Sequence, residues 1–243
     1  ANRFYTTYVY CDQESAKLFK LNKIPFHKIV VVNWLDEYEF PNWGLAKIET
    51  MLHQTEPYIH IDFDTIITKK LKPRTENISW GYMEVDFKSA ILDGKLSHHL
   101  IDYVYNNYLK TAKKYEDYSE FNYLDIVNAS LIVVTNPYPI RDVIKELHSR
   151  IAMYRNIVSS EINMFMEQFL FYQLIKSKGH LNYSIISNSK YNDLNLFWIN
   201  EISHDVSILN NFYNNGFIHI PQMDMFTDED FNFIYSYLLD KLK

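Results

Sequence analysis

The chain has 243 residues, of which 47% are hydrophobic and 22% charged, so it can bury a sizeable core. Its net charge of −6 and the absence of a dense basic cluster argue against nucleic-acid binding. The one cysteine, Cys11, excludes an intrachain disulfide, and no apolar run reaches the roughly 18 residues of a transmembrane helix.

Apolar periodicity predicts strands that alternate with helices along the chain. In chain order we expect a strand over 4–10, a helix over 14–20, a strand over 28–32, a helix over 43–54, strands over 58–61 and 80–85, a helix over 100–109, a strand over 131–134, helices over 140–151 and 162–175, a strand over 217–220 and a helix over 231–239. The stretch 188–215 is rich in Asn and is expected to be irregular. Such alternation is typical of one α/β domain with a mainly parallel central sheet flanked by helices.

The most informative segment is an apolar strand, Tyr58 to Ile61, that runs directly into Asp62 and Asp64. Open α/β sheets bind ligands at the carboxyl ends of their strands. Residues two apart in a strand project to the same side, so two carboxylates here would repel unless a cation lay between them. Carboxylate oxygens suit Mg²⁺ and Mn²⁺, so the pair indicates a metal site that can hold a diphosphate. The alternative is two surface aspartates at a strand end.

The run Trp43-Gly-Leu-Ala-Lys47, followed by Glu56-Pro-Tyr-Ile-His-Ile-Asp62-Phe-Asp64, resembles the helix–strand–Asp-x-Asp unit of GT-A glycosyltransferases. Within that class it is similar to a poorly characterised bacterial group. Further segments that match in the same order are Tyr8-Val-Tyr-Cys-Asp12, Asn128-Ala-Ser-Leu-Ile-Val-Val134, Glu167-Gln168 and Gly216-Phe-Ile-His219-Ile. The resemblance spans about residues 8 to 220 and implies a GT-A fold.

Two features depart from the pattern of this family. Ser130 stands where Gly is usual, and Pro221-Gln-Met follows His219 where Gly and Lys are often found. The family also begins with a strand and helix ahead of the Tyr8 strand, whereas seven residues precede Tyr8 here. We therefore expect that first unit to be missing, or the architecture to be trimmed.

The resemblance implies a divalent metal, Mn²⁺ or Mg²⁺, at Asp62, Asp64 and His219. Asp64 is expected to contact the ion directly, and Asp62 to contact the ion or the ribose. An imidazole such as His219 suits Mn²⁺ better than Mg²⁺. Lys47 would touch the diphosphate or pair with Asp64. The alternatives are a core histidine at 219 and a solvated lysine at 47.

A second set of residues is expected around the donor. Glu167 lies among apolar helix residues, where an unpaired carboxylate is costly to bury, so a functional role is favoured. By resemblance, Glu167 and Asn128 are the candidate catalytic residues. Glu167 would hydrogen-bond the donor-sugar hydroxyls or, alternatively, serve as catalytic base or nucleophile, and Asn128 would bond the sugar or the acceptor, with Gln168 and Ser130 lining the sugar pocket. Tyr10 and Asp12 would lie beside the nucleotide base, which completes the proposed donor site. The alternatives are an exposed helix edge for Glu167 and a turn residue for Asn128.

The predicted function is therefore metal-dependent transfer of a sugar from a nucleotide-sugar, with UDP as the expected nucleotide, to an acceptor hydroxyl. The metal would neutralise the diphosphate leaving group. Bacterial nucleotide-sugars are made in the cytoplasm and no signal peptide is evident, so a cytoplasmic enzyme is expected. The sequence identifies neither the sugar nor the acceptor.

Two alternatives remain open. Ile61-Asp62-Phe-Asp64-Thr65 also fits the Asp-x-Asp-x-Thr motif of haloacid-dehalogenase-type phosphatases, with Asp62 as nucleophile and Asp64 as acid–base, although the late acidic motif of that family is not found. The other alternative is a non-catalytic, transferase-like protein that binds sugars or partners.

Overall fold

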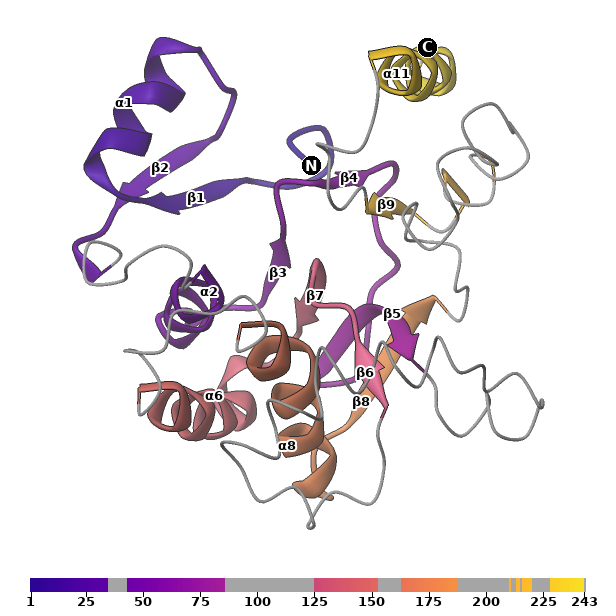
Figure 1. Ribbon diagram of the computed structural model, residues 1–243. Coiled ribbons are helices and arrows are strands. Elements are labelled where there is room, and N and C mark those ends of the chain that lie inside the picture. Colours follow the sequence, from indigo (N-terminus) through magenta and orange to yellow (C-terminus); the bar gives the residue numbers. More distant parts are fainter. Residues whose placement is uncertain are drawn as a thin grey trace.

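The computed structural model describes part of the chain, namely residues 1–34, 43–85, 125–152, 163–187, 210, 213–214, 216–219 and 228–242. Figure 1 shows an N-terminal lobe beside a larger body in which helices cover a sheet. The predicted helix over 100–109 and most of the stretch 188–215 lie outside the described residues.

The N-terminal lobe (residues 8–31) consists of β1 (Tyr8–Cys11), α1 (Gln13–Leu21) and β2 (Lys28–Val31), with the two strands parallel. Asp12 begins α1 by accepting a hydrogen bond from the Ser15 backbone amide at 2.8 Å, as an N-cap residue does. A small core of Val9, Cys11 and Ala16 joins the helix to the strands. Cys11 is thus a buried apolar residue at a strand end, and burial raises the pKa of its thiol.

The central sheet has the order β3–β7–β5–β6 in the described part of the chain, with β8 also paired to β5. The bounds are β3 (Tyr58–Ile61), β5 (Ile78–Val85), β6 (Ile126–Val127), β7 (Leu131–Val134) and β8 (Tyr183–Ser187). Of these pairings only β5–β8 is parallel; β3–β7, β5–β7 and β5–β6 are antiparallel. The mixed α/β class is as expected, but the sheet is mostly antiparallel rather than mainly parallel.

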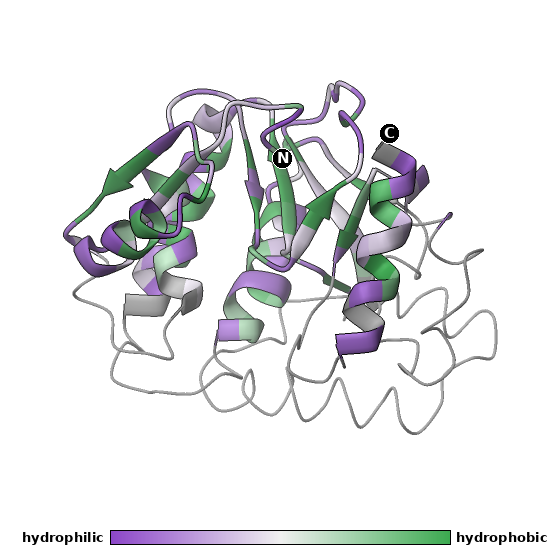
Figure 2. Ribbon diagram, turned by 90° about the horizontal axis from the view of Figure 1, so that it is seen from above, coloured by the Kyte–Doolittle hydropathy of each residue, from purple (hydrophilic) through white to green (hydrophobic). Residues whose placement is uncertain are grey.

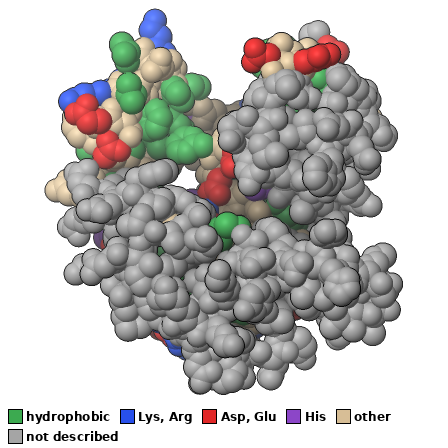
Figure 3. Space-filling view, in the orientation of Figure 1, with side chains coloured by type: hydrophobic (Ala, Val, Ile, Leu, Met, Phe, Trp, Pro, Cys, Tyr) green, Lys and Arg blue, Asp and Glu red, His purple; other side chains and the backbone are tan. Residues whose placement is uncertain are grey.

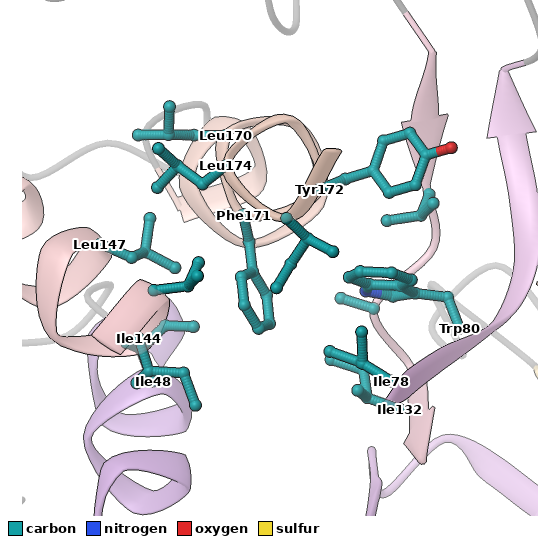
Figure 4. Close-up of a cluster of buried hydrophobic side chains, with 14 of the residues drawn as sticks. Ile48, Ile78, Trp80, Ile132, Ile144, Leu147, Leu170, Phe171, Tyr172 and Leu174 are labelled. Carbon is teal, nitrogen blue, oxygen red and sulfur yellow. The ribbon is translucent and has the colours of Figure 1, made fainter. Parts of the chain in front are cut away.

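One face of this sheet is covered by α2 (Trp43–Leu52), α6 (Pro137–Ala152) and the consecutive segments η4 (Phe165–Leu170) and α8 (Phe171–Ser177). Figure 4 shows side chains of α2, α6 and α8 meeting those of β5 and β7, with Phe171 between Ile48 and Trp80. All three are fully buried. Each such side chain contributes about 1.5–3 kcal/mol when it is removed from water, so this layer fixes where α2 and η4 lie.

Beyond the sheet, β4 (Thr65–Ile67) pairs with β9 (Phe217–His219) in an antiparallel ribbon. Gly81 of β5 approaches this ribbon so closely that an added Cβ would lie 3.0 Å from the ring of Phe217. The helix α11 (Asp228–Leu242) is the last described element. In Figure 2 the strands of the body are mostly hydrophobic in colour, in keeping with their burial between layers.

The predicted elements agree with the structure within a few residues where both can be compared. The strands at 58–61 and 131–134 have the predicted bounds. The strands β4, β6 and β8 were not predicted, because they are short or are specified by pairing rather than by a strong local pattern. Within the described residues, no helix combines the length and the apolar character needed to cross a membrane.

Candidate functional site

The two aspartates lie in a turn rather than in a strand. β3 ends at Ile61, the Asp62 amide donates to the Ser130 carbonyl at 2.9 Å, and the Thr65 amide donates to the Asp62 carbonyl at 3.0 Å. We call Asp62–Thr65 the acidic turn. Because the chain turns here, the two carboxylates do not follow the strand alternation that the sequence suggested, and they meet different partners.

Phe63, between the aspartates, has 75% of its surface exposed. Its ring centroid lies 6.0 Å from that of Phe19 and 6.2 Å from that of Phe26. These aromatic contacts join the acidic turn to the N-terminal lobe.

The Asp62 carboxylate is held by two side chains. Its Oδ2 lies 2.9 Å from Lys47 Nζ, and its Oδ1 lies 3.0 Å from His60 Nε2. Lys47 Nζ is also 2.7 Å from Glu167 Oε2, with the Lys47 and Glu167 side chains only 8% and 3% exposed. Lys47 therefore pairs with Asp62 and Glu167. From the sequence we expected it to contact the diphosphate or to pair with Asp64.

The charges of this group are set by their neighbours. Burial opposes ionisation of Lys47, but Asp62 and Glu167 outweigh it and hold the pKa of the ammonium above its usual range. Burial likewise opposes ionisation of Asp62, yet Lys47 and the His60 hydrogen bond hold the pKa of that carboxyl well below its usual range. Burial lowers the pKa of His60, so at neutral pH this imidazole is neutral and donates to Asp62 through Nε2.

Packing between α2 and η4 places Lys47 opposite Glu167. The Gly44 amide in the first turn of α2 donates to Asn163 Oδ1 at 3.0 Å, and a Cβ at Gly44 would lie 2.9 Å from the same oxygen. Glu167 lies on η4, a π-helical segment, and such segments occur frequently at functional sites. The close approach of the two helices therefore depends on the absence of a side chain at position 44.

Asp64 points to the β4–β9 ribbon. Thr65 is the register partner of His219, and Asp64 Oδ2 lies 3.4 Å from His219 Nε2. The other nitrogen, His219 Nδ1, is 3.1 Å from the Tyr82 hydroxyl. Asp64 Oδ1 is buried and has no hydrogen-bond partner among the described residues. A buried carboxylate oxygen without a donor is unusual, and an absent ligand or ion is one of its common explanations.

The segment before β7 completes the floor of the site. Asn128 is buried; its amide donates to the Tyr82 carbonyl at 3.1 Å, and its Oδ1 accepts from the Ser130 amide at 2.9 Å. Asn128 therefore shapes the turn into β7, which is the structural alternative considered for it. The Ser130 Oγ is buried and, within the described part, has no hydrogen-bond partner.

Seven of the residues selected from the sequence are therefore connected through the acidic turn. Lys47, Ser130 and His219 contact Asp62 or Asp64 directly, Glu167 is connected through Lys47, and Asn128 through Ser130. Figure 3 shows acidic and histidine side chains in a hollow beside the N-terminal lobe. The structure therefore gathers into one region residues from five separate parts of the sequence.

The predicted metal ligands are only partly assembled. Asp64 and His219 face each other, but Asp62 faces Lys47 and His60. Over the described ranges, no group of three or more His, Cys, Asp or Glu side chains is arranged to hold an ion. In the described part of the chain, the groups that could hold a cation are therefore Asp64, whose Oδ1 accepts no hydrogen bond from that part, and His219.

Three residues that were predicted to contact the nucleotide-sugar, Tyr10, Asp12 and Gln168, are not among these seven residues. Both carboxylate oxygens of Asp12 accept from Ser15, and these hydrogen bonds lower the pKa of Asp12. The Tyr10 hydroxyl donates to Gln54 at 3.3 Å. Gln168 is half-buried beside Glu167 on η4.

Two residues of the site were missed by sequence reasoning. His60 precedes Asp62 by two positions, a spacing that could have indicated contact between their side chains. Tyr82 gives no comparable signal, because its contact with His219 spans 137 positions and follows from the packing of β5 against β9.

The chain belongs to a family of unknown function, DUF6734, whose sequence profile matches residues 1–223. That match includes the acidic turn and every residue assigned to the site. Neither a curated protein nor a solved structure matches the chain.

Proposed function

We propose that this protein is a metal-dependent glycosyltransferase of the GT-A type, in which the acidic turn binds the diphosphate of a nucleotide-sugar through Mn²⁺ or Mg²⁺. The observation that carries the proposal is the Asp64 carboxylate, which has one oxygen 3.4 Å from His219 and the other buried with no hydrogen bond from any described residue. Such an oxygen is suited to an inner-sphere cation.

The charge of the region supports a cation. Among the described side chains, three carboxylates (Asp62, Asp64 and Glu167) lie around the acidic turn with one lysine between two of them. Because His60 is neutral, this lysine balances only part of the negative charge. Two protein ligands are enough for such an ion, since Mg²⁺ bound to phosphates commonly keeps several waters and contacts only one or two carboxylates.

In this proposal Asp64 and His219 would hold the ion, which would supply Lewis-acid neutralisation of the leaving diphosphate. Tyr82 fixes the imidazole through Nδ1, which leaves Nε2 as the nitrogen directed at Asp64. Lys47 and His60 hold Asp62 beside Asp64 and His219. There the Asp62 carboxylate would add negative charge or accept a hydrogen bond from a ribose hydroxyl. This division of roles follows from the contacts of the two aspartates, which differ although the residues are two apart.

The donor sugar is proposed to lie against η4 and the turn before β7. Glu167 and Gln168 would bond its hydroxyls, and the Ser130 hydroxyl, which has no hydrogen-bond partner among the described side chains and backbone, would face it. The contact with Lys47 holds the Glu167 carboxylate in place at 2.7 Å, so we assign Glu167 to binding the sugar rather than to nucleophilic attack. Asn128 contributes by shaping the turn that carries Ser130.

The test is binding and turnover in one set of variants. Calorimetry with UDP is expected to show binding that requires Mn²⁺, and release of UDP from a panel of UDP-sugars is expected to require the same metal. Asp64→Asn is expected to abolish metal-dependent binding and to lower donor hydrolysis by about 100-fold or more. Asp142→Asn, at a carboxylate of α6 that is 88% exposed, is the matched control and should behave as wild type.

Other results would favour the alternatives. Hydrolysis of p-nitrophenyl phosphate that depends on Asp62 would replace the transferase with a phosphatase. Metal-dependent UDP binding without hydrolysis or transfer of any sugar would leave a non-catalytic binding protein. Full activity of Asp64→Asn in the presence of Mn²⁺ would refute the metal site.

A further inference from the structure

A basic and apolar segment lies on the N-terminal lobe. Its Phe19 and Phe26 contact Phe63 of the acidic turn, while its lysines and leucines are exposed to solvent. It runs from Lys17 to Lys28 with the sequence Lys-Leu-Phe-Lys-Leu-Asn-Lys-Ile-Pro-Phe-His-Lys, and it contains four lysines and no acidic residue. This composition contrasts with the net charge of −6 for the whole chain. The segment covers the second half of α1, the connection that follows it and the start of β2.

The apolar side chains of this segment are unusually open to solvent. Leu18 is 56% exposed, Leu21 77% and Ile24 42%. Leu18 and Leu21 are three apart on α1 and therefore lie on the same side of the helix, while Ala16 is the one residue of α1 that is fully buried. Figure 3 shows hydrophobic side chains gathered over this lobe. Grouped exposed apolar residues of this kind mark a contact surface.

The lysines stand between these apolar residues. Lys20 and Lys23 are exposed and flank Leu21, and Lys17 pairs with Glu14 at 2.6 Å. Lys23 adopts a positive φ of 53° and lies in the turn that follows α1. Ile24 comes next, and all residues from 20 to 25 are exposed. This surface therefore combines exposed apolar side chains, which can be buried against a partner, with lysines that surround them.

We propose that this surface, formed by residues 17–28, docks on a lipid bilayer that contains anionic headgroups. Exposed leucines beside lysines are the side-chain pattern of interfacial helices, whose apolar groups enter the headgroup boundary while the lysines meet the negative surface. A second copy of the chain is a poorer partner, because two identical surfaces would bring their lysines together. Nucleic acid would meet the lysines but not bury Leu18, Leu21 and Ile24.

The experiment is vesicle flotation of the full chain. Binding is expected to vesicles of phosphatidylcholine mixed with phosphatidylglycerol, and not to phosphatidylcholine alone. Because part of the attraction is electrostatic and screened by salt, the bound fraction should fall as salt is raised. Donor hydrolysis by the unbound protein is a separate measurement, so failure of membrane docking and failure of the proposed transferase activity are distinguishable.

Two double variants separate the two contributions. Leu18→Gln with Leu21→Gln removes the apolar groups, and Lys20→Gln with Lys23→Asn removes two cations; Asn suits the positive φ at position 23. Each is expected to lower the partition coefficient by about tenfold or more. Both alter exposed side chains, so thermal unfolding should stay close to wild type and shows that the protein is folded.

The matched control lies on α11. Tyr235 and Leu239 are 62% and 43% exposed, comparable to the leucines of α1, but α11 begins with Asp228, Glu229 and Asp230. Tyr235→Gln with Leu239→Gln should leave vesicle binding unchanged. The proposal is overturned if wild type does not float with anionic vesicles, or if the α1 variants and the α11 control bind equally. A concentration-dependent dimer that is lost in Leu18→Gln with Leu21→Gln, without vesicle binding, would assign the surface to a second copy instead.

Discussion

The buried ion pair of Lys47 is the contact on which the stability of the site most depends. Lys47 Nζ lies 2.9 Å from Asp62 and 2.7 Å from Glu167, and all three side chains are buried or half-buried. Replacing Lys47 with Met keeps an unbranched side chain, one atom shorter, but removes its charge. Loss of one partner from a buried pair typically costs about 3–5 kcal/mol, because the remaining carboxylates keep their desolvation and lose their cation. We expect Lys47→Met to lower the free energy of unfolding by that amount.

The dependence on pH follows from the raised pKa of Lys47. A cation whose pKa is higher in the folded state stabilises the fold fully below its unfolded pKa, so the wild-type contribution is constant between pH 5 and pH 8. In Lys47→Met, a buried carboxylate that has lost this cation takes up a proton more readily at the lower pH. The loss of stability should therefore be smaller at pH 5 than at pH 8.

Urea unfolding followed by circular dichroism measures these effects. The double variant Lys47→Met with Glu167→Gln should recover at least about 1 kcal/mol relative to Lys47→Met, because one buried charge is removed with its partner. Lys17→Met, at an exposed pair with Glu14, should change stability by less than about 0.5 kcal/mol. Equal losses for Lys47→Met and Lys17→Met, or strict additivity in the double variant, would refute the reasoning.

Two further predictions concern the packing and the charge of the site. Gly44→Ala places a Cβ 2.9 Å from Asn163 Oδ1, so we expect the free energy of unfolding in urea to fall by about 1–3 kcal/mol. Gly179→Ala is the control, because its added Cβ would have nothing within 4 Å. Equal effects of the two substitutions would show that α2 and η4 adjust freely. The pKa of Asp62 is lowered in the folded state, so its stabilising contribution is present above the unfolded pKa near 3.8 and is lost as pH falls further. Unfolding between pH 5 and pH 3 should therefore depend less on pH in Asp62→Asn than in wild type, and parallel curves would contradict this assignment.

The candidate site was predictable where its residues share a local signal. The strand over 58–61 followed by two aspartates was evident from the apolar run and the adjoining charges, and the structure places both residues after β3. Glu167 was selected because a carboxylate stood among apolar residues, and it is indeed buried, with Lys47 as a partner. The sequence indicates such residues because the cost of burying a charge depends on its apolar neighbours in the chain.

The sequence could not provide the identity of the partners. Lys47 was expected to meet Asp64 or a phosphate, and it meets Asp62 and Glu167 because α2 packs on η4 through Gly44 and Asn163. Strand direction was likewise hidden: β3 has the same apolar pattern whether β7 runs parallel or antiparallel beside it, and the antiparallel pairing depends on how the intervening chain returns.

The sequence by itself determined most of the described elements, the amphipathic helices and the candidate acidic residues, because side-chain periodicity and the cost of burying a charge act over a few neighbouring positions. Only the tertiary structure decided that Asp62 turns to Lys47 and His60 while Asp64 turns to His219, a residue 155 positions later in the numbering. The turn at Asp62–Thr65 separates the two carboxylates, and the ribbon of β4 and β9 brings the imidazole to one of them. Long-range pairing of this kind depends on how whole layers pack, which no local pattern specifies.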